Sequence, residues 1–145
     1  MATLEIAIEI ARQAHAGQVD KAGEDYIGHP LRVMEMCETE EQKIVGVLHD
    51  VVEDSDWTFE MLEEEGFSDE IIDALRCITK QSEDEDYDDF ISRVMTNLLA
   101  IKIKLCDIED NLDLSRLGEL TEADINRSQK YMRARARLKD ALNES

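Results

Sequence analysis

Residues 46–55 read GVLHDVVEDS, a stretch in which four polar side chains recur with the period of a helix. Because residues four apart lie on one face of an α-helix, we expect His49 beneath Glu53 and Asp50 beneath Asp54. An imidazole beside a carboxylate can bind a divalent cation, and a carboxyl pair one turn further on could orient or deprotonate a water on that cation. A solvated acidic helix end would give the same residue pattern about as often. The choice between these two interpretations therefore depends on whether further ligand candidates occur in the chain.

Two further ligand candidates lie elsewhere in the chain. His29 precedes Pro30, which suits the first turn of a helix because it has no N–H to leave unpaired. Asp107 ends the run IKIKLCD, and Asn111 follows one turn later. Each alone is more typical of a capping or solvated side chain. With the histidine and aspartate of the first stretch they form a two-His, two-Asp set, which without thiolate suits Mn²⁺, Fe²⁺, Zn²⁺ or Mg²⁺ more than copper.

Five short motifs occur in one order along nearly the whole chain. They are AHAGQ at 14–18, KAGEDYIGHP at 21–30, LHDVVED at 48–54, ITK at 78–80, and KLCD at 104–107 with Asn111. The order His…His-Asp…Asp resembles the HD superfamily of metal-dependent phosphohydrolases. It resembles more closely the hydrolase domain of RelA/SpoT proteins and their short stand-alone homologues, which remove the 3′-pyrophosphate of (p)ppGpp.

The resemblance implies a role for each of ten residues. The implied metal ligands are His29, His49, Asp50 and Asp107, with Mn²⁺ the usual ion. The implied catalytic pair acting on the nucleophilic water is Glu53 and Asp54. The implied substrate-binding residues are Lys21, Asn111, Arg127 and Tyr131, although an ordinary amphipathic helix would give the last two about as often. His15 also matches the family, as a supporting residue rather than a ligand.

The chain departs from the RelA/SpoT pattern at several positions near the expected substrate. Asp20 stands before Lys21 where those hydrolases carry an arginine, and residues 108–110 read IED where they have basic and histidine side chains. The segment 112–117 reads LDLSRL where they have Arg and Thr. Each change removes positive charge or adds negative charge where a polyanionic substrate is expected, which leaves a different substrate open.

Composition indicates a small intracellular enzyme. With 145 residues and 43% hydrophobic residues, we expect one folded domain spanning 1–145 despite the net charge of −19. No apolar run is long enough to span a membrane, and the start lacks a secretory pattern. Three cysteines in apolar contexts read as reduced core thiols, so we expect a cytoplasmic protein. Strong acidity argues against nucleic-acid binding. The expected partner is a small-molecule nucleotide, and self-association stays open.

The helical pattern predicts an all-α fold, a compact single-domain bundle of about seven or eight helices. Helix starts are expected at Thr3, Thr39 (a capping box with Gln42), Thr58 and Ser68, and another helix at Pro30. Further helices are expected over about 87–96, 98–110 and 121–142, with an acidic loop over 82–89.

The expected C-terminal helix carries almost the only concentration of basic residues in the chain, namely Arg127, Lys130, Arg133, Arg135, Arg137 and Lys139. The plainest interpretation is a solvated face that pairs with acidic neighbours. A second is that part of it lies over the metal and attracts phosphates. An RNA-binding arm is a third, disfavoured because few aromatic residues are present for stacking.

The sequence therefore predicts an HD-type metal-dependent phosphohydrolase acting on a nucleotide, with (p)ppGpp the leading candidate through the resemblance. One alternative is another HD phosphatase, acting on nucleoside monophosphates or NADPH. The other is a nucleotide sensor without catalysis. The intact pair of Glu53 and Asp54 disfavours the sensor, whereas Asp20 favours a different substrate.

Overall fold

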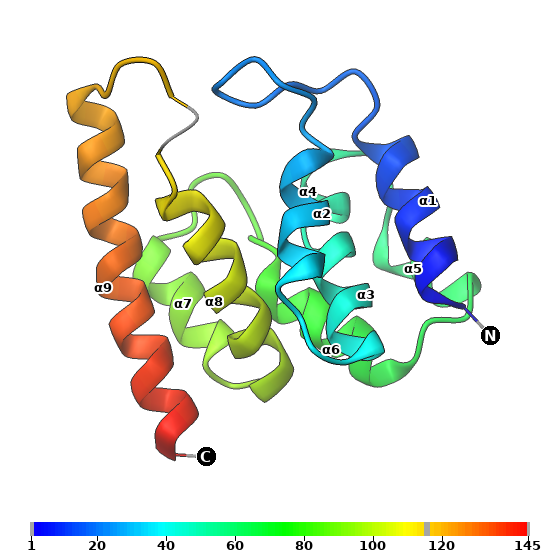
Figure 1. Ribbon diagram of the computed structural model, residues 1–145. Helices are drawn as coiled ribbons and strands as arrows, with labels where there is room; N and C mark the ends of the chain where they lie inside the picture. The colour runs from blue at the N-terminus through cyan, green and yellow to red at the C-terminus, as the bar shows by residue number, and fades with distance from the viewer. Residues whose placement is uncertain (1, 115–116, 145) are drawn as a thin grey trace.

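The computed structural model describes residues 2–114 and 117–144, and these residues form nine helices and no strand (Figure 1). The helices are α1 (Leu4–Ala14), α2 (Gly28–Glu35), α3 (Glu40–Leu48), α4 (Val51–Asp54), α5 (Phe59–Glu64), α6 (Asp69–Ile78), α7 (Tyr87–Val94), α8 (Leu98–Leu112) and α9 (Glu122–Glu144). The all-α prediction is confirmed. Because α4 is a single turn, the eight longer helices match the expected number. Within the described residues, no helix has the length and apolar character needed to span a bilayer.

Four predicted helix starts are confirmed by their side-chain caps, whereas the helix expected at Pro30 begins at Gly28 and has no side-chain cap. The hydroxyls of Thr3, Thr58 and Ser68 each accept a hydrogen bond from the backbone N–H three residues later. Thr39 and Gln42 form the predicted capping box, in which each side chain bonds the other's backbone N–H. These bonds satisfy N–H groups that the first turn of a helix leaves without partners.

The HD motif lies at a break between two helices, so the expected continuous helix through it is wrong. Helix α3 ends at Leu48, His49 and Asp50 form a turn, and α4 begins at Val51. The imidazole Nδ1 of His49 lies 2.6 Å from the carbonyl oxygen of Gly46, which in a continuous helix would accept from the N–H of Asp50. The side chain thus competes for that carbonyl and helps to end α3.

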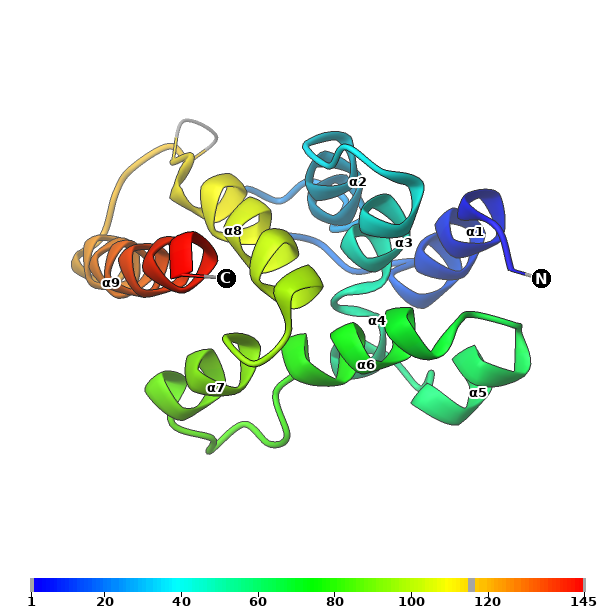
Figure 2. The same cartoon turned by 90° about the horizontal axis from the view of Figure 1, so that it is seen from below.

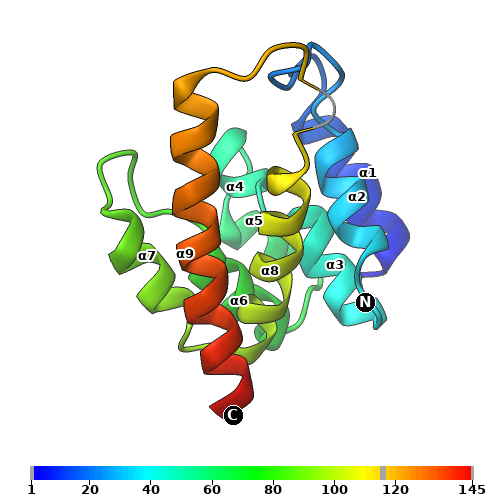
Figure 3. The same ribbon diagram turned by 60° about the vertical axis from the view of Figure 1, so that its left-hand side comes forward.

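Helix α8 is central to the arrangement of the molecule. Figures 1 and 2 show α8 between the α2–α3 pair on one side and α9 on the other, and α8 contacts each of these helices. Its apolar side chains are fully buried at Ile103 and Ile108. Figure 3 shows α9 passing in front of α8, and the two helices are in contact. Since α2, α3 and α8 meet here, side chains near residues 29, 49 and 107 can share one site.

The core around these helices comes from short apolar runs. Residues 44–48 of α3 are all buried, and Leu48 is 1% exposed. Burying a side chain of that size stabilises a fold by about 1.5–3 kcal/mol. The HD turn therefore follows directly from the most buried segment of the chain, which fixes its backbone.

Candidate active site

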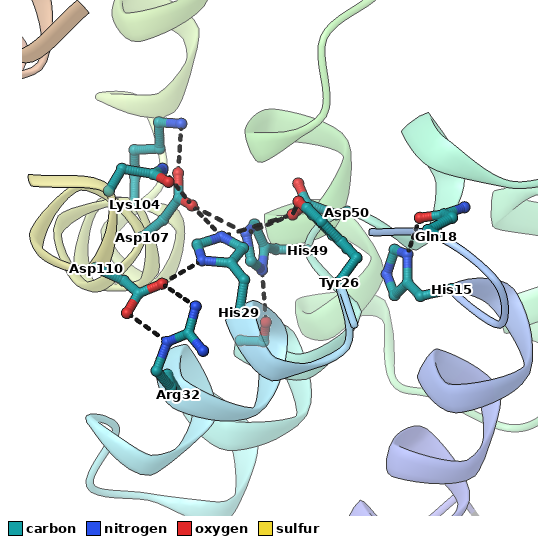
Figure 4. Close-up of polar contacts among 12 residues, drawn as sticks. His15, Gln18, Tyr26, His29, Arg32, His49, Asp50, Lys104, Asp107 and Asp110 are labelled. Atoms are coloured by element: carbon teal, nitrogen blue, oxygen red, sulfur yellow. Dashed lines mark hydrogen bonds and ion pairs between the residues drawn. The ribbon is translucent and has the colours of Figure 1, made fainter. Parts of the chain in front are cut away.

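The four predicted ligands converge on one point. His29 comes from α2, His49 and Asp50 from the turn between α3 and α4, and Asp107 from α8 (Figure 4). The Oδ1 atom of Asp107 lies 2.8 Å from His29 Nε2 and 3.2 Å from His49 Nε2. Asp50 Oδ2 lies 3.1 Å from His49 Nε2, and donor atoms of His29, His49 and Asp50 all fall within 4.8 Å of one another.

Both histidines are oriented by their other ring nitrogen. His49 Nδ1 donates to the carbonyl oxygen of Gly46, and His29 Nδ1 lies 2.6 Å from the carboxylate Oδ2 of Asp110. Each Nε2 therefore faces the other ligands. Metal-binding histidines characteristically carry such a partner on the far nitrogen, so the arrangement fits a divalent cation held by nitrogen and oxygen donors.

The electrostatics of the cluster favour positive charge at its centre. Burial opposes protonation of His29, but hydrogen bonds to Asp107 and Asp110 outweigh it and raise the pKa of His29 to about 9. The pKa of His49 is likewise raised, because Asp50 and Asp107 outweigh its burial. The protonated imidazoles thus supply the positive charge among these carboxylates that a bound cation would otherwise supply.

Each ligating carboxylate is held by further polar contacts. The Tyr26 hydroxyl donates to Asp50 Oδ2 at 2.5 Å. Asp107 Oδ2 accepts from the Lys104 ammonium at 2.7 Å, and the Asn111 amide donates to Asp107 Oδ1 at 3.2 Å. Burial alone would raise the pKa of Asp107, but Lys104 and the histidines hold it well below its usual value. Both carboxylates are therefore ionised acceptors.

The proposed catalytic pair lies at the edge of this cluster. Glu53 lines the pocket above the ligands, and its Oε1 accepts from the backbone N–H of Lys80 at 3.2 Å. Asp54 lines a neighbouring pocket instead, and its carbonyl oxygen accepts from the Gln18 amide at 2.8 Å. Partial desolvation and the carboxylates of Asp50 and Glu53 raise the pKa of Asp54 to about 6.

The ligand cluster forms part of a pocket of about 330 Å³. Nine of the ten predicted site residues line it, and Asp54 is the one outside its described lining. The cationic side chains on its wall are Lys21, Arg32, Lys80, Lys104, Arg127 and Lys130. An equal number of carboxylates line it, so the pocket has balanced charge in a chain whose net charge is −19. Local charge thus favours an anionic ligand here more than on the remaining surface.

Different parts of the C-terminal helix fit two of the interpretations of its basic residues, the pocket wall and the ion-paired surface. Arg127 and Lys130 line the pocket, and Tyr131 lies beside Tyr87 with ring centres 6.3 Å apart. Arg135 and Arg137 instead pair with acidic side chains, Glu109 and Asp88, away from the described pocket lining. The N-terminal turns of α9 therefore supply cationic side chains to the pocket wall, and the following turns form an ion-paired face.

Two of the acidic departures, Glu109 and Asp110, do not line the pocket. Asp110 is 3% exposed and lies behind His29, and Glu109 pairs with Arg135 between α8 and α9. Asp20 does line the pocket, and its Oδ1 accepts from the backbone N–H groups of Ala22 and Glu24 at 2.9 and 3.0 Å. Asp20 thus shapes the loop that carries Lys21.

The sequence analysis missed several residues of the site, among them Tyr26, Arg32, Lys80, Lys104, Asp110 and Lys130. A signal existed for Lys104, since a lysine three residues before Asp107 interrupts an apolar run. The roles of Tyr26 and Asp110 depend on contacts across the fold, which spacing does not reveal. The predicted free thiols are present, with Cys37 buried and Cys77 and Cys106 half-buried.

Comparison with known proteins identifies relatives of the chain. No protein-family model matches the chain. The guanosine-3′,5′-bis(diphosphate) 3′-pyrophosphohydrolase of Haemophilus influenzae is 32% identical over 116 residues, which are 71% of this chain and 17% of that protein. The bifunctional (p)ppGpp synthase/hydrolase SpoT of Escherichia coli is 32% identical over 118 residues, 71% of this chain and 16% of that protein.

A solved structure shares the fold. It comes from work titled as a metazoan ortholog of SpoT that hydrolyzes ppGpp, with a TM-score of 0.73 and 22% identity, and the match covers 99% of this chain and 93% of that one. The chain is an HD-type, RelA/SpoT hydrolase-like domain. The resemblance read from its motifs is confirmed. This RelA/SpoT-like chain spans about one-sixth of the length of the curated relatives it matches.

Proposed function

We propose that this chain, as one domain, hydrolyses the 3′-pyrophosphate of (p)ppGpp or a closely related nucleotide, using a bound divalent cation. The observation that carries the proposal is the meeting of two imidazole Nε2 atoms and two aspartate oxygens in a pocket with cationic walls. The names of the relatives, which are (p)ppGpp pyrophosphohydrolases and a SpoT enzyme, point to the same substrate.

The ion in this proposal is Mn²⁺, held by His29, His49, Asp50 and Asp107. When bound, such an ion lowers the pKa of a water and withdraws charge from phosphoryl oxygens. Asn111 and Lys104 keep the carboxylate of Asp107 in place through their hydrogen bonds to its two oxygens. Tyr26 does the same for Asp50.

The chain's own acid–base groups in this proposal are Glu53 and Asp54. Glu53 lies on the pocket wall, where its carboxylate orients the attacking water or takes its proton. The raised pKa of Asp54, about 6, suits a group that exchanges a proton near neutral pH. Asp54 supports its neighbour from the adjoining pocket.

Substrate phosphates are bound by the cations on the pocket wall. Lys21 and Arg127 both line that wall, and the proximity of Arg127 contributes, after burial, to the lowered pKa of Lys21, while Asp124 opposes this shift. Asp124 also pairs with Arg127, so a phosphate bound here would share the two cations with this carboxylate. Asn111 and Tyr131 line the same wall and contact the nucleotide in this proposal.

The test is a product assay on metal-loaded protein. Protein stripped with a chelator and reloaded with Mn²⁺ is incubated with ppGpp, a nucleoside monophosphate panel and NADPH, and pyrophosphate and orthophosphate are measured separately. We expect pyrophosphate from ppGpp with the wild type and none with His49→Ala. Absence of pyrophosphate together with orthophosphate from another substrate contradicts the (p)ppGpp proposal.

A second candidate is a phosphatase for another nucleotide, such as a nucleoside monophosphate or NADPH. Asp20 favours it, because this carboxylate lines the pocket at the position where the RelA/SpoT resemblance places an arginine. The same assay separates the two candidates by the product released. Nucleotide binding without any turnover would instead identify a sensor.

A further inference from the structure

Two charged side chains outside the predicted site form a connected chain behind His29. Asp110 of α8 approaches His29 Nδ1 with its Oδ2 at 2.6 Å. Arg32, one turn after His29 on α2, donates from Nε to Asp110 Oδ1 at 2.8 Å and from Nη2 to Oδ2 at 3.2 Å. Figure 4 shows this order of contacts, from the guanidinium through the carboxylate to the imidazole.

We propose that Asp110 and Arg32 are positioning residues for the metal site, and that Gly28 is the glycine that leaves room for them. Asp110 holds His29 with Nδ1 as the donor, so that the lone pair of Nε2 is directed at the cation. Arg32 holds Asp110 in place. The inference rests on the proposed function in one respect, since it requires that the site bind a divalent cation.

The two histidines are held in different ways, and this explains why His29 needs such a device. His49 Nδ1 bonds a backbone carbonyl of its own helix, Gly46, which local structure fixes. His29 has a side-chain acceptor instead, supplied by a helix 81 residues away in sequence. The orientation of His29 therefore depends on the rotamer of Asp110, and a partner that fixes this rotamer fixes the ligand.

Because the carboxylate of Asp110 is buried, it needs a charged partner such as Arg32. Asp110 is 3% exposed, and a buried carboxylate is costly unless charged or polar partners satisfy it. The guanidinium of Arg32 meets both of its oxygens, a two-pronged contact that restricts the carboxylate to one plane. Arg32 also links α2 to α8, the two helices that carry His29 and Asp107.

Gly28 offers a way to displace Arg32 without changing any charge. A Cβ at this position would lie 2.9 Å from Arg32 Nη1, closer than carbon and nitrogen atoms approach, and would meet no backbone within 4 Å outside its own helix turn and chain neighbours. Gly28 lies in the first turn of α2, and its backbone does not require glycine, so alanine there fits the helix. Gly28→Ala is thus expected to leave the fold intact and move the guanidinium.

The first experiment measures the dissociation constant for Mn²⁺ by electron paramagnetic resonance of the free ion. We expect Asp110→Ala to bind Mn²⁺ about 10–100-fold more weakly, the usual effect of removing such a partner. Asp110→Asn should lose less, because its amide oxygen can still accept from Nδ1. The matched control is Glu109→Ala, which removes a carboxylate from the adjacent position of α8 where it bonds Arg135 and not a histidine.

The second experiment is a double-mutant cycle in the same assay. Gly28→Ala and Arg32→Ala should each weaken Mn²⁺ binding. A purely electrostatic role for Arg32 would give the opposite sign, since removing a cation would favour another cation. Because both changes act through the guanidinium, Gly28→Ala should have no effect in the Arg32→Ala background.

The third readout is the hydrogen bond of the His29 Nδ1–H group, observed by ¹H–¹⁵N NMR of histidine-labelled, Zn²⁺-loaded protein. The wild type should show a downfield, slowly exchanging Nδ1 proton at His29, and Asp110→Ala should lose this signal while the signals of His49 remain. A residue that only packed the core would not change this hydrogen bond.

The outcomes separate this inference from the proposed function. Wild-type Mn²⁺ affinity in Asp110→Ala, or an undiminished effect of Gly28→Ala in the Arg32→Ala background, would overturn the inference while the metal site stands. Wild-type protein that binds Mn²⁺ and hydrolyses no nucleotide would overturn the proposed function and leave the inference standing. Failure of the wild type to bind Mn²⁺ would overturn both.

Discussion

Asp107 makes polar contacts with four other side chains of the site. Its Oδ1 faces both histidines and Asn111, and its Oδ2 faces Lys104. The order of the motifs identified Asp107 from sequence, because that order reflects the chemistry of the ligands. Lys104 was not assigned, since its role appears only when α8 is buried and an ammonium must lie beside the carboxylate.

Replacing Lys104 by an uncharged residue tests whether its ammonium stabilises the buried carboxylate of Asp107. Lys104 is 8% exposed and its ammonium lies 2.7 Å from Asp107, so Lys104→Met leaves a buried carboxylate without its cation. We expect the metal-free protein to lose about 3–5 kcal/mol in free energy of unfolding by urea, and Mn²⁺ to restore part of it. Lys102→Met, on the exposed side of the same helix, is the control. Equal stability of the two variants would show that the histidines and Asn111 are sufficient partners for Asp107 without Lys104.

The pKa of His29 predicts a pH dependence of the metal-free protein. A folded-state pKa of about 9, above the ordinary 6.5, means that folding favours the protonated imidazole. The resulting stability is fully present below pH 6.5 and is lost as the pH rises through about 9. Urea unfolding at several pH values should show this decline, and His29→Gln should show less of it. A stability that rises over this range in the metal-free wild type would contradict the assignment.

Glu53 is the residue whose substitution separates chemistry from metal binding. Glu53→Gln keeps the shape of the side chain and removes the proton acceptor, so we expect kcat to fall by roughly 10²–10⁴-fold with Mn²⁺ affinity unchanged. The measurements are steady-state kinetics and Mn²⁺ titration of the same preparation. Normal turnover would mean that Asp54 or the ion alone activates the water.

At the scale of the elements, local signals predicted the helix starts and tertiary contacts decided the rest. The caps at Thr39 and Ser68 are encoded within four residues, so sequence was sufficient for them. The break after Leu48 depends on the imidazole of His49 bonding Gly46, which a periodicity argument does not include. Likewise, the pattern of α8 did not show that Asp110 lies behind His29 instead of lining the pocket.

The loop before α2 gives a prediction at this scale. Asp20 both holds two backbone N–H groups and places a negative charge on the pocket wall. Asp20→Asn keeps an acceptor and removes the charge, so we expect a lower KM for ppGpp at low salt and a smaller change at moderate salt. Asp20→Arg adds charge but loses the loop bonds, so it should gain less than its charge suggests. An unchanged kcat/KM in both variants would show that this loop does not meet the substrate.

At the scale of the whole molecule, the fold reconciles a net charge of −19 with the anionic substrate that we propose. Lysines and arginines from the loop after α1, from α2, α8 and α9, and from the segment after α6 gather on one pocket, while most acidic residues lie elsewhere. Composition alone suggested that anions would be repelled. The distribution of charge could not be predicted from sequence, because it depends on how α9 packs along α8 (Figure 3).

The central claim is that residues 29, 49, 50 and 107 hold one cation, and anomalous diffraction from crystals grown with Mn²⁺ tests it most directly. The account predicts one strong manganese peak roughly 2.0–2.3 Å from His29 Nε2, His49 Nε2 and an oxygen each of Asp50 and Asp107. A manganese peak elsewhere in the molecule, or one here with Asp107 beyond bonding distance, would contradict it.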